Sequence, residues 1–119
     1  MNIASKIRNT KGGRTVETEG KHLTEIQKKQ EKIITFYGVH KQQNQLVEEC
    51  AELIVAIQKQ QRYNFSTISD SIIEEIADVK NLIEQIESYK YHVAKEIKAI
   101  KENKVNRELE RIKAEKTRW

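Results

Sequence analysis

The sequence predicts an all-α protein, built as a helical bundle of about four helices. The 119 residues contain no proline, and all four glycines lie within the first 38 positions, so residues 39–119 include neither residue type. Sheet proteins need turns, and turns depend on glycine and proline. Aromatic residues make up 6% of the chain and charged residues 34%. This composition favours long charged helices with narrow apolar faces over a β-sandwich.

The first helix is expected to start at Thr24 and to end before Gly38. Thr24 and Gln27 have the spacing of a capping box, in which the hydroxyl accepts from the N3 amide and the glutamine side chain reaches back. Gly38 suits the position that follows a helix, where the backbone turns left-handed. We expect residues 1–21, which contain Gly12-Gly13, to form an irregular basic N-terminal segment before an all-α domain over 22–119.

Three further helices follow from the apolar spacing. The second is expected from about His40 to Arg62, where apolar residues recur at steps of three and four. The third begins near Ser69 or Ser71, and Ser71 and Glu74 have the spacing of a second capping box. A break within 89–92 separates it from the fourth helix. The apolar seam of the third helix is expected to follow heptad steps through Ile72, Ile76, Val79, Ile83 and Ile86.

Charge and cysteine content exclude several classes of protein. The net charge of +4 is below that typical of a dedicated duplex binder. The single cysteine, Cys50, rules out an internal disulfide framework and fits a reducing compartment, so we expect a cytoplasmic protein. No apolar run approaches the length of a membrane span. Apolar seams on every helix of so small a bundle predict a dimer at least.

Two acidic pairs stand in matched settings on the second and third helices. Glu49 and Glu52 are three residues apart, as are Glu75 and Asp78, and each pair encloses an alanine and precedes an apolar residue. Three residues is nearly one helical turn, so each pair projects from one face. Two carboxylates about 5 Å apart repel by roughly 3 kcal/mol at an effective dielectric of ~20. Antiparallel packing of the two helices would therefore require a positive charge between them.

Carboxylate ligands without histidine or cysteine suit Mg²⁺, with Mn²⁺ as a possible substitute. The alternative is a solvated acidic face, which is common for one such pair and less so for two on neighbouring helices. A di-iron carboxylate bundle needs Glu-x-x-His on two helices. The chain has this motif once, at Glu19 and His22 across Gly20, so we reject that class.

The paired motif resembles that of a known family. Glu49-x-x-Glu52, a spacer over 53–74 and Glu75-x-x-Asp78 are similar to the metal motif of the MazG-like all-α nucleoside triphosphate pyrophosphohydrolases, in their short single-domain form. The resemblance spans about residues 24–113. It implies a homodimer or homotetramer that binds Mg²⁺ and hydrolyses a nucleoside triphosphate, such as a dNTP, between the α and β phosphates. The products are a nucleoside monophosphate and pyrophosphate.

The resemblance also implies roles for single residues. Glu49, Glu52, Glu75 and Asp78 would be metal ligands. Glu48 occupies the family's preceding acid position, where it would hold a second metal, orient the attacking water or be a solvated residue. We assign Glu48 and Glu49 as the catalytic residues. Helix positions, besides the resemblance, suggest the substrate-binding candidates. Gln42 and Gln45 share the helical face of Glu49 and are candidates for the base, and Lys104 and Arg107 share one face of the fourth helix and are candidates for the phosphates. Lys80, two residues after Asp78, is a further phosphate candidate at a position where the chain departs from the family pattern.

Each of these residues also has an ordinary structural interpretation. Gln42 and Gln45 are two of many glutamines, and Lys104 and Arg107 fit a solvated helix face. The rival function is a non-enzymatic basic helical module that binds nucleic acid or a partner helix. We consider nucleic acid unlikely as a partner, because acids are mixed with the basic residues throughout and because that function leaves the paired acids unexplained.

Overall fold

The computed structural model describes residues 23–63 and 67–118, which form helices and no strand. This confirms the all-α class. The expected N-terminal segment, 1–21, lies outside the described residues. The helices within the described part of the chain are α2 (Glu25–Tyr37), α3 (Val39–Gln61), α4 (Asp70–Tyr89) and α5 (Tyr91–Arg118).

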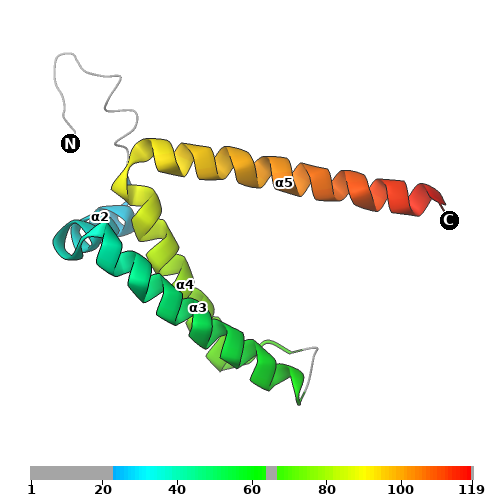
Figure 1. Ribbon diagram of the computed structural model, residues 1–119, viewed down its shortest axis with the longest axis horizontal. Coiled ribbons are helices and arrows are strands. Elements are labelled where there is room, and N and C mark those ends of the chain that lie inside the picture. The colour runs from blue at the N-terminus through cyan, green and yellow to red at the C-terminus, as the bar shows by residue number, and fades with distance from the viewer. Residues whose placement is uncertain (1–22, 64–66, 119) are drawn as a thin grey trace, which may run out of the picture.

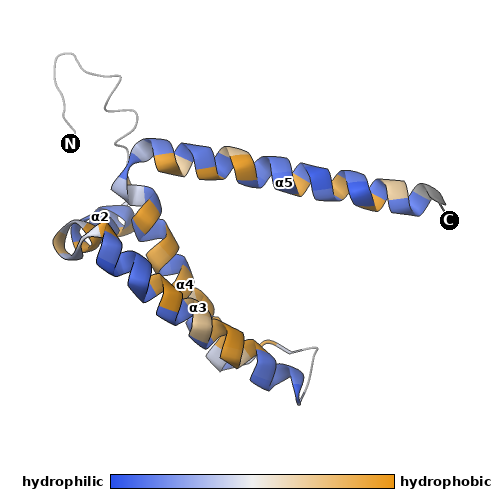
Figure 2. Ribbon diagram, viewed as in Figure 1, coloured by the Kyte–Doolittle hydropathy of each residue, from blue (hydrophilic) through white to orange (hydrophobic). Residues whose placement is uncertain are grey.

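The helices α2, α3 and α4 pack together, while α5 leaves them. The most extensive contact joins α3 to α4, and α2 packs chiefly on α4. Figure 1 shows α5 extending away from this group after a contact with α4 alone. No α5 residue whose side chain is described is buried. Figure 2 shows that α5 is largely hydrophilic, with separate apolar turns along its length.

The core of the three packed helices is small and partly polar. Its buried apolar side chains are Ile34, Ala56, Ile72, Val79 and Leu82. Three glutamines are buried with them, one from each helix: Gln30, Gln42 and Gln85.

The buried glutamines form a hydrogen-bonded network that ties the three helices. Gln42 donates to Gln85 at 2.8 Å, and Gln85 donates to Asn81 at 3.3 Å. From α2, Gln30 donates to Asn81 at 3.1 Å and to Glu84 at 3.0 Å. Pairing offsets the cost of burying amides, although Gln30 Oε1 is buried without a partner among the described residues. The bonds of the network link α2 and α3 to α4.

The expected seam of α4 is wrong at two positions. Ile76 and Ile83 are each 39% exposed, whereas Leu82 and Gln85 are buried. The buried face of α4 is therefore rotated away from the heptad seam. The amide network supplies the reason, because pairing Gln85 with Gln42 turns this side of α4 inward. Ile76 and Ile83 remain on an uncovered apolar surface.

The helix ends follow local chemistry. The Thr24 capping box is confirmed, with the Gln27 amide donating to Thr24 Oγ1 at 3.1 Å and the Thr24 amide donating to Gln27 Oε1 at 2.8 Å. The expected Ser71 capping box is wrong. Ser69 caps α4 instead, because its Oγ accepts from the Ile72 amide at 3.2 Å and the helix has begun before Ser71.

Two connections are very short. Gly38 alone separates α2 from α3, with φ +92° and ψ +148°. Lys90 alone separates α4 from α5, in an extended conformation with φ −143° and ψ +131°. The expected break within 89–92 is thereby confirmed. Among the described residues, no helix has a stretch that is long and apolar enough to span a membrane.

Gly38→Ala should destabilise the protein although an added Cβ would meet no atom within 4 Å. The reason is the positive φ, which costs a residue with a side chain about 1 kcal/mol or more. Urea unfolding measures the effect. Gln43→Ala, at an exposed position on α3, is the control and should stay within about 0.5 kcal/mol of wild type. Equal midpoints for both variants would contradict the backbone argument.

Candidate metal centre

Three glutamates converge where α3 packs on α4. Glu49, Glu52 and Glu75 each place one carboxylate oxygen so that the three atoms lie within 4.8 Å of one another. Glu49 and Glu52 project together because they are almost one turn apart on α3. Glu75 comes from the facing side of α4, three residues after buried Ile72 and four before buried Val79. Core packing therefore brings the carboxylates together.

The cluster contains carboxylate oxygens that nothing in the described chain satisfies. Glu49 and Glu75 are half-buried, and Oε1 of each is buried without a hydrogen-bond partner. The other Glu49 oxygen accepts from Gln45 Nε2 at 3.0 Å. No ion pair within 23–63 and 67–118 involves any of the three glutamates. Buried oxygen atoms of this kind are costly unless a proton or a cation joins them.

The pKa of Glu75 also indicates that negative charge accumulates at this cluster. Partial burial raises the pKa of Glu75 above its ordinary value, and the charges of Glu52, Asp78, Glu49 and Glu74 raise it further, in that order. Like charges disfavour ionisation of the carboxyl that they surround. A bound cation would reverse this effect.

The donor set fits a hard divalent cation. Oxygen ligands from carboxylates, with no histidine or cysteine in the group, suit Mg²⁺ or Mn²⁺. Asp78 is exposed and lies outside the three closest atoms, but it is near enough to raise the pKa of Glu75. A magnesium ion usually keeps several waters, so three or four carboxylates with an open side are sufficient.

Glu48 is exposed beside the cluster and contributes no atom to it. One residue along a helix is a rotation of about 100°, so Glu48 projects from the flank of the face that carries Glu49. A groove of about 310 Å³ adjoins the cluster on the other side of Glu52, between α3 and the start of α4. Its walls include Val55, Ala56 and Lys59.

The groove is lined in part by the predicted ligands Glu52 and Glu75, but Val55, Ala56 and Lys59 in its wall were not among the sequence candidates. A signal was available for Lys59, which follows Glu52 by seven residues and therefore shares its face of α3. No comparable signal identifies Val55 or Ala56, because apolar side chains at helical spacing predict core.

Four predicted substrate residues lie away from the carboxylates. Gln42 is buried, and its amide donates to Gln85, so it does not present a hydrogen-bonding edge to a ligand. Lys80 pairs with Glu84 at 4.0 Å and lies two residues, about 200° of rotation, from Asp78. Lys104 and Arg107 belong to α5, which does not contact α3. Only Gln45 among the substrate candidates touches the cluster, through Glu49.

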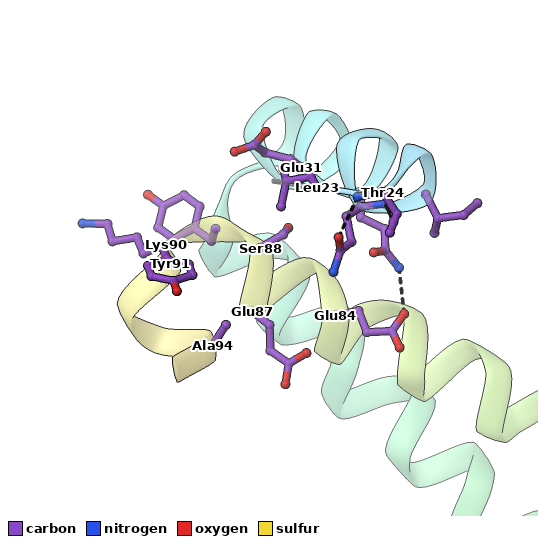
Figure 3. A pocket seen from close by; sticks show the side chains of 13 residues that line it. Leu23, Thr24, Glu31, Glu84, Glu87, Ser88, Lys90, Tyr91 and Ala94 are labelled. Atoms are coloured by element: carbon purple, nitrogen blue, oxygen red, sulfur yellow. Dashed lines mark hydrogen bonds between the residues drawn. The ribbon is translucent and has the colours of Figure 1, made fainter. Parts of the chain in front are cut away.

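A larger cavity, of about 680 Å³, lies at the opposite end of the packed helices. Figure 3 shows its walls, which come from α2, the end of α4 and the start of α5, with Glu31, Glu84 and Tyr91 among them. None of the predicted site residues lines it. The carboxylate cluster therefore lies beside the smaller groove and not at the larger cavity.

Comparison of the chain with protein-family models, with curated proteins and with solved structures gave no match.

Glu75→Gln should stabilise the metal-free protein, and more so as the pH rises. A raised pKa in the folded state means that the protonated carboxyl favours folding below the ordinary value of 4.5, and that this contribution is lost as the pH rises through the raised pKa. Thermal unfolding in a chelator from pH 4.5 to 8 tests this. The midpoint of the variant should exceed that of wild type by a margin that grows with pH.

The matched control is Glu96→Gln, an exposed glutamate on α5 that lies outside the carboxylate cluster. It should leave the pH dependence of the melting midpoint unchanged. A Glu75→Gln protein that melts below wild type at pH 8 would show that the cluster is not under repulsion.

Proposed function

We propose that this protein is a Mg²⁺-dependent nucleoside triphosphate pyrophosphohydrolase, a dNTP being the preferred class of substrate, and that it belongs with the MazG-like enzymes that its acidic motif resembles. The observation that carries the proposal is the group of carboxylate oxygens within 4.8 Å of one another, two residues of which keep a buried oxygen without a partner. Such oxygens are costly unless a proton or a cation joins them, and a divalent cation held there would supply the positive charge that hydrolysis of a triphosphate requires.

In this proposal Glu49, Glu52, Glu75 and Asp78 hold the ion. A bound Mg²⁺ would neutralise triphosphate charge and make a coordinated water more acidic. The remaining work falls to the residues of the chain. Glu48, exposed beside the ligands, takes the proton from the attacking water at its carboxylate or orients that water.

The other chain groups position the ends of the substrate. Gln45 holds Glu49 through a hydrogen bond of 3.0 Å, so it orients a ligand besides being a candidate for base contact. The groove beside Glu52, with Val55 and Ala56 in its wall, is the apolar space nearest the cluster. Lys59 lines the same groove as Glu52 and Glu75, so its ammonium group is a candidate to bind a phosphate there.

A second function has one observation in its favour. The exposed helix α5 carries nine lysine and arginine residues against five glutamates. A basic, unburied helix of this length suits a module that binds nucleic acid or an acidic partner helix. Such a module would show affinity that falls steeply with salt and no response to Mg²⁺.

The decisive measurement is release of pyrophosphate from a panel of canonical and modified nucleoside triphosphates in the presence of Mg²⁺. We expect release from one or a few substrates. Glu52→Gln should lower the rate by roughly 100-fold or more, since mutation of a residue that only hydrogen-bonds to a metal ligand already lowers metal affinity or activity about 10- to 100-fold. Glu31→Gln, away from the cluster, is the matched control and should keep the wild-type rate. Folded protein with no release from any triphosphate would refute the hydrolase.

Metal binding is measured separately by thermal unfolding. At ten times its dissociation constant, Mg²⁺ should stabilise the folded state by about 1.4 kcal/mol, a rise of several degrees in the melting midpoint for a domain of this size. Glu52→Gln should abolish the rise, and Glu31→Gln should keep it. Equal responses of the two variants would show that Mg²⁺ acts elsewhere.

A further inference from the structure

The cavity of about 680 Å³ between α2, the end of α4 and the start of α5 has an acidic lining. Three glutamates and one lysine line it, which leaves a formal charge of −2. Two of the glutamates, Glu84 and Glu87, are half-buried and lie almost one turn apart on α4, so they project from one face. Figure 3 shows both of them on the α4 wall. We call this space the acidic cavity.

Little positive charge from the chain itself compensates these carboxylates. The lysine of the lining, Lys90, places its Nζ over the Tyr89 ring at 5.8 Å from the centroid and pairs with none of the glutamates. Among the described residues, the one ion pair made by a glutamate of the cavity joins Glu84 to the exposed Lys80 at 4.0 Å. An exposed pair of this kind contributes little. The acidic cavity therefore attracts a cation.

The same lining holds a buried oxygen atom without a partner. Gln30 lines the cavity and is 5% exposed. Its amide nitrogen donates to Asn81 Oδ1 at 3.1 Å and to Glu84 Oε1 at 3.0 Å. A carboxylate only accepts, so the amide cannot be turned over, and Oε1 is left without a hydrogen-bond partner in the described chain. A buried acceptor is costly when unpaired, so a ligand here gains by donating an N–H or O–H group.

The lining does not suit a single metal ion. Within 23–63 and 67–118, one group of acidic side chains converges closely enough to surround an ion, and it is the carboxylate cluster formed by Glu49, Glu52 and Glu75. The three glutamates of the acidic cavity form no such group. A ligand that satisfies them must therefore carry its positive charges at separated positions.

A linear aliphatic polyamine has these properties. Each of its ammonium groups carries a positive charge and donates N–H bonds, and the methylene segments between them separate the charges. Those segments would contact the apolar side chains in the lining, which are Leu23, Ile26 and Ala94. The cavity volume falls in the range of sites for small molecules. An anionic ligand is disfavoured by the charge of the lining.

We propose that the acidic cavity is a binding site for a linear aliphatic polyamine. Its ammonium groups pair with Glu84 and Glu87, and one N–H group donates to Gln30 Oε1. Because that oxygen is covered in the free protein, its neighbours move aside as the N–H group enters. The site lies at the other end of the packed helices from the carboxylate cluster, and it does not depend on the proposed hydrolysis.

Calorimetric titration of the full chain with spermidine tests the site. At about 150 mM NaCl, which screens exposed charges, we expect a single equivalent to bind. Glu84→Gln with Glu87→Gln should weaken binding by about tenfold or more, since two charges that face the ammonium groups are lost. Glutamine at position 84 still offers an oxygen to Gln30, so the amide network is kept.

The matched control is Glu108→Gln with Glu110→Gln, which makes the same change in net charge on α5, away from the cavity. It should alter the affinity for spermidine by less than about twofold. A wild-type protein that does not bind spermidine, or equal weakening by the two pairs of substitutions, would overturn the proposal.

The hydrogen bond to Gln30 is tested from the side of the ligand, without any substitution. Spermidine whose nitrogens are all fully methylated keeps its charges and its chain but has no N–H group. It should bind about tenfold or more weakly than spermidine, because Gln30 Oε1 then stays unpaired. Equal affinity of the two compounds would show that charge alone holds the ligand and would overturn the assignment of Gln30.

Glu52→Gln separates the acidic cavity from the carboxylate cluster. This variant should bind spermidine with the wild-type affinity, because Glu52 lies outside the cavity. Loss of spermidine binding in Glu52→Gln would place the polyamine at the carboxylate cluster and overturn the proposal. Absence of pyrophosphate release from the wild-type protein would refute the hydrolase and leave the polyamine site intact.

Discussion

The packing of α3 on α4 is the constraint from which the other features follow. Ile72 and Val79 bury one face of α4, and Glu75 lies between them on the same face. Apolar burial therefore forces Glu75 against Glu49 and Glu52, whatever their mutual repulsion. Hydrophobic packing is not directional, so it can hold like charges together at a cost that a bound cation removes. The same packing of α3 on α4 therefore forms both the core and the candidate metal centre.

Several parts of this arrangement could be predicted from local sequence. The Thr24 and Gln27 capping box and the break near Lys90 were predictable because each depends on neighbouring residues only. The acidic pairs were predictable as faces of single helices. Their convergence depended on how α3 meets α4, which spacing suggests but does not determine. The groove beside Glu52 could not be predicted, since its shape belongs to two helices at once.

The errors have a common cause. Hydrophobic periodicity assigned Ile76 and Ile83 to the apolar seam, and Gln42 was expected to contact the base of the substrate. In the structure, paired amides take the inner positions, with Gln42 bonded to Gln85. Patterns of apolar residues cannot anticipate a buried polar network, because the same glutamine is unremarkable on a surface and stable inside when its partner is present.

The single extended residue between α4 and α5 has a mechanical consequence. With 28 residues in α5 and a rise of about 1.5 Å each, the helix is a rod of roughly 42 Å, and its direction from the end of α4 depends on the backbone torsions of Lys90. A rotation of about 10° at Lys90 displaces the far end by roughly 7 Å, by the geometry of a rod of that length. Two torsion angles thus set the direction of α5, which is about a quarter of the chain. Substitutions near Lys90 would therefore displace the far end of α5 by changing the direction of the helix, without altering any contact at that end.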